Sequence, residues 1–193
     1  MVTVRLATSD DIARLATTAT RAFADDPLLR WFFPDDDEYD ALNPGLVSHM
    51  CRRWQATSSQ WCTDDGVALA GWVPPGRPDV NIERPTLEHP ERRLAKFEAL
   101  RVAFGEHTPV EPHWYLNMLA THPDWQRQGL GAALMGAVFS IADEQRLPCY
   151  LETETVDNVA YYRHHGFEVR SEWDLNTDLD PGPHLWGMLR APR

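Results

Sequence analysis

The chain has 193 residues, of which 43% are hydrophobic and 24% charged, and this fits a single globular domain over residues 1–193. Its formal net charge of −11 disfavours general nucleic-acid binding, which needs a basic surface, although an acidic surface can favour a cationic small molecule. It has no run of about 18 apolar residues that could span a membrane, and its first residues lack the apolar core of a secretory signal.

The first half of the chain alternates strand-type and helix-type patterns. In order, they predict a strand over 3–8, a helix from Ser9, a short aromatic helix or turn over 28–33, a helix over 38–57 with a potential break at Pro44, and hairpin strands over 60–63 and 67–73. The hairpin turn is Asp-Gly, a strong turn signal between apolar runs. The aromatic cluster around Trp31 is open to two interpretations, core packing or an apolar wall for a ligand.

The second half predicts a different alternation. Its elements are a helix over 91–104, a strand over 114–120, a helix over 130–142, a strand over 148–154, a short helix over 159–165, and strands from 167 and over 185–189. The central strand, helix and strand imply a right-handed parallel crossover. The expected class is α+β with a mixed sheet. A Rossmann domain is excluded because no Gly-x-Gly-x-x-Gly follows the first strand.

The junction between the strand over 114–120 and the helix over 130–142 carries the chemistry. The segment Gln126-Arg127-Gln128-Gly129-Leu130-Gly131 places two glycines where the helix begins. Bare amides and the positive end of the helix dipole together favour an anion. The Gln-x-x-Gly-x-Gly pattern alone is weak, and a helix start that binds nothing is equally compatible with it.

Three features in order resemble the GNAT family of acyl-CoA N-acyltransferases. They are the segment 126–131, the strand Leu151-Glu152-Thr153, and Asn158 followed by Tyr162-Arg163-His164-His165-Gly166-Phe167. The resemblance covers essentially the whole chain. Within the family, the opening residues, Phe23-Ala24-Asp25-Asp26-Pro27 and Trp186-Gly187-Met188 most resemble the puromycin N-acetyltransferase subgroup. The resemblance implies a mixed, mostly antiparallel central sheet flanked by helices on both faces, and acetyl transfer from acetyl-CoA to an amine.

The resemblance also implies site residues. Tyr162 takes the position of the general acid, with Tyr161 as the alternative, because a tyrosine can protonate a leaving thiolate at neutral pH. Glu152 is favoured as general base, while Glu154, Asp26, His113 and a water chain stay open. We expect Asp26, Trp31 and Trp72 to contact the acceptor. The residues expected to hold acetyl-CoA are Leu119, Ala120, Thr121, Gln126, Arg127, Gln128, Gly129, Leu130, Gly131, Ala132 and Asn158.

The acceptor is expected to be a primary amine of a small molecule, because the aromatic N-terminal half favours an enclosed apolar pocket. A protein or peptide N-acetyltransferase and a non-catalytic acyl-CoA sensor remain as alternatives, and a homodimer is left open. No metal site is proposed, since His164 and His165 diverge on a helix and no third ligand is spaced with them. Three scattered cysteines without Cys-x-x-Cys spacing are typical of reduced thiols, so we expect a cytoplasmic protein.

Overall fold

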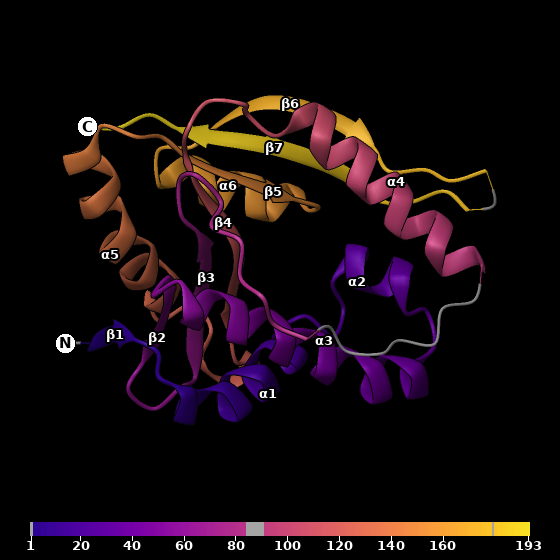
Figure 1. Cartoon of the computed structure of the whole chain (residues 1–193), viewed down its shortest axis with the longest axis horizontal. Coiled ribbons are helices and arrows are strands. Elements are labelled where there is room, and N and C mark those ends of the chain that lie inside the picture. The colour runs from indigo at the N-terminus through magenta and orange to yellow at the C-terminus, as the bar shows by residue number, and fades with distance from the viewer. Residues whose placement is uncertain (1, 84–90, 179) are drawn as a thin grey trace.

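The computed structural model describes residues 2–83, 91–178 and 180–193 (Figure 1). Helices and strands alternate along the chain much as the apolar spacing predicts. The elements are β1 (Val4–Leu6), η1 (Ser9–Asp11), α1 (Ile12–Ala22), α2 (Pro27–Phe32), α3 (Asp36–Ala56), β2 (Gln60–Thr63), β3 (Ala68–Val73), α4 (Glu91–His107), β4 (Trp114–Thr121), η2 (Pro123–Trp125), α5 (Leu130–Gln145), β5 (Cys149–Thr153), α6 (Val156–His164), β6 (Glu168–Asp174) and β7 (His184–Arg190).

The described strands form a seven-stranded sheet in the order β1-β2-β3-β4-β5-β7-β6. Neighbours pair antiparallel except β4 and β5, which are parallel. Two parallel neighbours need a crossover between them, and α5 provides it. The predicted mixed, mostly antiparallel sheet and its parallel crossover are therefore confirmed.

Helices cover both faces of the sheet, as predicted. On one face α1 and α3 pack their apolar side chains against Leu69, Met118 and Ala120. On the other face α5 packs Leu134 and Val138 against the opposite side of the same strands, and α6 joins it through Val159. A third cluster, at the end of the sheet in Figure 1, gathers α2 and α4 around side chains from β6 and β7.

The ends of several helices depart from the sequence prediction for local reasons. Pro44 lies inside a continuous α3, which begins after Asp35 caps the Glu38 amide at 3.0 Å. The short helix α6 starts earlier than predicted because Thr155 accepts the Asn158 amide at 3.2 Å and so sets its N-terminus. Even α3, with 21 residues, lacks the apolar length for a membrane crossing, and the same holds for every helix in the described ranges.

The middle of the sheet contains an irregularity that positions the site. Along β3, Gly71 pairs with Met118 while Trp72 pairs with Leu116, so Asn117 is an extra residue in β4. Such a bulge bends its strand and reverses which face later side chains point to. On its other edge β4 pairs with β5 only through Trp114 and Tyr115. Beyond Tyr115 the two parallel strands diverge, which leaves a gap in the sheet.

Candidate active site

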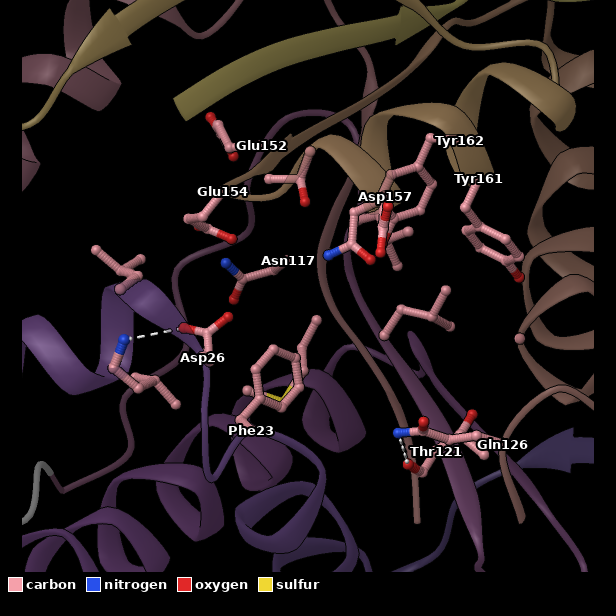
Figure 2. A pocket seen from close by; sticks show the side chains of 18 of the residues that line it. Phe23, Asp26, Asn117, Thr121, Gln126, Glu152, Glu154, Asp157, Tyr161 and Tyr162 are labelled. Atoms are coloured by element: carbon pink, nitrogen blue, oxygen red, sulfur yellow. Dashed lines mark hydrogen bonds between the residues drawn. The ribbon is translucent and has the colours of Figure 1, made fainter. Parts of the chain in front are cut away.

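A cavity of about 1060 Å³ occupies the gap between β4 and β5 (Figure 2). Because the gap between the strands passes through the sheet, side chains from both faces of the sheet line the cavity. One end is formed by the η2–α5 loop and α6, and the other by α2, α3 and α4. Residues that line it include Phe23, Asp26, Leu28, Leu29, Phe32, Leu46, Met50, Phe97, Leu100, Phe104, Tyr115, Asn117, Leu119, Thr121, Gln126, Arg127, Gly129, Leu130, Gly131, Ala132, Glu152, Glu154, Asn158, Tyr161 and Tyr162.

The loop before α5 delivers backbone amides to one end of the cavity. Gly129 stands at the helix N-cap with φ +78°, in the left-handed region that glycine adopts without strain. Gln126 closes the loop by donating from Nε2 to the Thr121 carbonyl at 3.4 Å. The first amides of an α-helix have no partners within the helix, so the start of the 16-residue α5 offers donors and a positive dipole to an anion.

The two glycines of this loop serve different purposes. A Cβ on Gly129 would meet nothing within 4 Å, so its positive φ is the reason for glycine. A Cβ on Gly131 would lie 2.8 Å from the hydroxyl oxygen of Tyr161. Gly131 lets the Tyr161 hydroxyl pack against the first turn of α5.

Glu152 stands on β5 at the opposite end of the cavity. Burial raises the pKa of its carboxyl to about 7, and hydrogen bonds from Tyr115, Tyr150 and Thr108 offset part of that rise. The Thr108 hydroxyl lies 3.4 Å from Glu152 Oε1. A carboxyl with this pKa exchanges its proton near neutral pH, which is the range where a general base works best.

Two more carboxyl groups accompany Glu152. Glu154 lies just beyond the end of β5 and lines the same cavity, and Asp26 approaches from the N-cap of α2, where its Oδ1 accepts the Leu29 amide at 2.9 Å. Burial raises the pKa of both, and the negative charges of Asp26 and Glu152 raise that of Glu154 further. Figure 2 shows the three carboxyl groups on one side of the pocket, away from Thr121 and Gln126.

Adjacent tyrosines of α6 point to different parts of the cavity. Burial raises the pKa of Tyr162, and the nearby charges of Tyr161, Glu154 and Asp26 add to the effect, so its phenol stays protonated. Tyr161 instead places its hydroxyl at Gly131. Their rings meet edge to face at 5.4 Å. The expected divergence of neighbouring helical side chains is thus observed, with Tyr162 nearer the carboxyl groups.

Most of the predicted site residues meet in this cavity. Those that line it are Asp26, Leu119, Thr121, Gln126, Arg127, Gly129, Leu130, Gly131, Ala132, Glu152, Asn158 and Tyr162. Ala120 does not, because the bulge at Asn117 turns its side chain toward α1 and α3. Gln128 is exposed outside the lining. His113 is buried behind the site against the ring of Tyr150 and also lies outside the lining.

Two predicted acceptor contacts are corrected. Trp72 is fully buried and packs edge to face on Trp114 and Phe139 at 6.5 and 6.4 Å, on the α5 face of the sheet. Trp31 is buried in the cluster around α2 and α4. Both indoles lie in the core, outside the cavity lining. A large apolar indole suits the protein core and the wall of an acceptor pocket equally well, and only the fold distinguishes the two positions.

Other lining residues were not predicted. Phe97, Leu100 and Phe104 come from one face of α4, a periodicity visible in the sequence that reads equally well as core packing. Asn117 was hidden because an isolated polar residue in an apolar strand does not reveal a bulge. Phe23 and Met50 gave no separate signal. The apolar residues among them form the walls of the carboxyl end of the cavity.

Comparisons with known proteins agree with this geometry. Residues 93–169 match the family model described as an acetyltransferase (GNAT) domain. An uncharacterized N-acetyltransferase of Schizosaccharomyces pombe is 33% identical over 79 residues, which are 41% of this chain. The chain spans about a third of the length of that relative, 32%.

Solved structures extend the likeness to the whole chain. One described as histone acetyltransferase HPA2 and related acetyltransferase, from Corynebacterium glutamicum, has a TM-score of 0.70 at 24% identity and covers 100% of this chain and 97% of its own. A polyamine N-acetyltransferase of Drosophila melanogaster has a TM-score of 0.66 at 13% identity, with 99% and 100% covered. The chain has the GNAT fold. Within that fold, residues 93–169 are the part that matches the acetyltransferase domain model.

Proposed function

We propose that this GNAT protein transfers an acetyl group from acetyl-CoA to a primary amine of a small molecule, by direct attack in a ternary complex. One observation carries the proposal: a single cavity joins the amides of α5 at one end to Glu152 at the other, through the gap between β4 and β5, and Tyr162 of α6 lines it on the side nearer the carboxyl groups. An anionic cosubstrate with a long arm and a reactive end fits such a passage.

The end formed by α5 suits the CoA pyrophosphate. Backbone amides from Gly129 to Ala132 and the helix dipole would hold its charge, with Arg127 at the same rim. The edge of β4 beyond Tyr115 has no strand partner on the β5 side, so its backbone around Leu119 to Thr121 is free to pair with the amides of the pantetheine arm. Ala120 can take part only through its backbone. Asn158 completes this end.

The other end suits the reaction. Glu152, in its carboxylate form, would accept the proton of the attacking ammonium group directly or through water, which leaves a neutral nucleophile. The nitrogen then forms a bond to the thioester carbonyl carbon, the carbon–sulfur bond breaks, and the new amide nitrogen loses its excess proton to water. Tyr162 would donate its phenolic proton to the departing sulfur, because burial keeps that phenol protonated. Glu152 then releases its proton to solvent and Tyr162 regains a proton from solvent, so both residues return to their starting protonation states.

A small acceptor is favoured by the walls of the cavity. Side chains of α2, α3 and α4 surround the carboxyl end of the cavity on the side away from β5. This leaves a pocket, which suits a small molecule, whereas a peptide acceptor would need a groove. The Drosophila polyamine enzyme, which shares the fold, is consistent with a small amine. The sequence resemblance to puromycin N-acetyltransferases adds aminonucleosides to the acceptors worth testing.

The test is thiol release from acetyl-CoA across a panel of alkylamines, arylalkylamines, aminonucleosides, aminoglycosides and peptides. We expect turnover with at least one small amine, and none with peptides. Turnover with peptides alone would replace the proposal by a peptide N-acetyltransferase. Tight CoA binding without turnover of any amine would favour an acyl-CoA sensor instead.

A further inference from the structure

The carboxyl end of the cavity holds more negative charge than one base requires. Glu152, Glu154 and Asp26 line it together. Among the described lining residues the one arginine, Arg127, belongs to the α5 loop at the other end, and no lysine is present. Within the described part of the chain none of the three carboxyl groups forms a salt bridge.

Glu154 is the least satisfied of the three. Protein surrounds its side chain except on the cavity side, and it receives no hydrogen bond from another described residue. A buried carboxylate ordinarily has a cation or several donors, because burial without them is costly. Asp26 Oδ1 accepts the Leu29 amide, and the Asp26 side chain lines the same cavity. Two carboxyl groups from separate elements thus converge without an ion-pair partner among the described residues.

A metal ion does not explain them. No group of three or more His, Cys, Asp or Glu side chains in the described residues has the arrangement that could hold a metal. The surrounding surface is also apolar, with Phe23, Leu28 and Leu29 beside Asp26. Hard metal ions need further oxygen ligands, whereas an organic cation brings its own hydrocarbon to such walls.

We propose that the acceptor is a dication: Glu152 faces the amine that is acetylated, while Asp26 and Glu154 bind a second cationic group joined to it by a short apolar spacer. This rests on the proposed function and adds its substrate class. Glu152 lies on β5 and Glu154 just beyond its end, and two residues of extended chain span about 7 Å, so the two cationic groups are separated by a comparable length. Apolar residues on α2 and α4 contact the spacer.

The test compares diaminobutane with pentylamine, which has the same number of heavy atoms and one cationic group fewer. For the unaltered enzyme we expect kcat/KM for the diamine to be at least about 10-fold higher, because a charge-assisted contact is lost with the monoamine. Asp26→Asn and Glu154→Gln should each lower the diamine value about 10-fold or more and leave pentylamine within about twofold. Asparagine still caps α2, so the fold is retained.

Matched controls are Asp25→Asn, the exposed neighbour of Asp26, and Glu168→Gln, exposed on β6. Both remove one negative charge from the surface and should leave the ratio of diamine to monoamine unchanged. Equal rates on the two amines, or equal losses on both in the Asp26 and Glu154 variants, would overturn the dication proposal while the acetyltransferase activity stands. If neither amine nor any other in the panel is acetylated, the proposed function itself fails and this inference with it.

Discussion

Two regions of the molecule bury carboxyl groups in opposite ways. At the start of the sheet Asp11 is 5% exposed and ion-paired with Arg5 at 2.7 Å and Arg14 at 2.8 Å, and it accepts the Thr8 amide at 2.9 Å. The hydrogen bond from Arg5 holds the pKa of Asp11 well below its usual range. In the cavity, burial raises the pKa of Glu152 and Glu154, and the charge of Arg77 offsets only part of the rise for Glu152.

The difference separates carboxyl groups that have a structural role from those available for binding or catalysis. Charges matched by protein groups stabilise the fold and are inert, because all their contacts are made within the chain. Buried charges left without an ion-pair partner destabilise the fold and keep their affinity for a cationic ligand. A similar compensated carboxyl, Asp143 with Arg190 at 2.8 Å, has its pKa lowered to about 2 and lies away from the cavity. The sign of the pKa shift therefore distinguishes the two kinds of site.

The largest expected effect is on catalysis at the uncompensated site. Tyr162→Phe should lower kcat about 100-fold and change acetyl-CoA affinity little, because only proton donation to sulfur is lost. Tyr161→Phe is the matched variant, and its kcat should stay within about threefold since that hydroxyl lies at Gly131. Steady-state thiol release and CoA binding measure both. A larger loss in kcat for Tyr161→Phe would exchange the two roles.

Removing a compensated charge should cost stability and leave kinetics intact. Asp11→Asn is expected to lower the free energy of unfolding by about 2 kcal/mol at pH 7, less than for a fully buried pair because Arg5 and Arg14 are partly exposed. Since the folded pKa of Asp11 is lowered, its contribution is present above about pH 4 and lost as pH falls further. Urea unfolding at several pH values measures this. A stability equal to that of the unaltered chain at pH 7 would contradict it.

Removing an uncompensated charge should raise stability, and by less than Asp11→Asn lowers it. The folded pKa of Glu154 is raised, so the stability linked to its protonated form is present at low pH and lost as pH rises through that raised value. Glu154→Gln should therefore raise Tm by roughly 3 °C at pH 9 and change it little at pH 5, as followed by thermal denaturation. A lower Tm for the variant at pH 9 would show that the carboxylate has a stabilising partner within the protein.

The sequence predicted much of this organisation because periodicity and turn chemistry are local properties. Apolar spacing identified α5 and the strands on either side of it, and the glycine pattern at 126–131 identified the helix N-terminus that faces the cavity. The family resemblance indicates Glu152 and Tyr162, and the structure brings them to one cavity.

What the sequence could not predict depends on contacts between distant segments. Trp72 and Phe97 are both large and apolar, yet one packs in the core and the other lines the cavity. The bulge at Asn117 appears only when β4 is paired with β3, and it moves Ala120 to the other face. Likewise, that Glu154 has no ion-pair partner among the described residues is a property of the assembled fold that no spacing along the chain reveals.

The most direct test of the account is the pH dependence of kcat for the unaltered enzyme and Glu152→Gln, with saturating acetyl-CoA and a small-molecule amine. Because the pKa of Glu152 is raised to about 7 and its carboxylate is the active form, kcat of the unaltered enzyme should rise with pH through a midpoint near 7. The variant should lose this midpoint and run about 100-fold slower at pH 8. Superimposable pH profiles for the two proteins would contradict the assignment of Glu152 as the base.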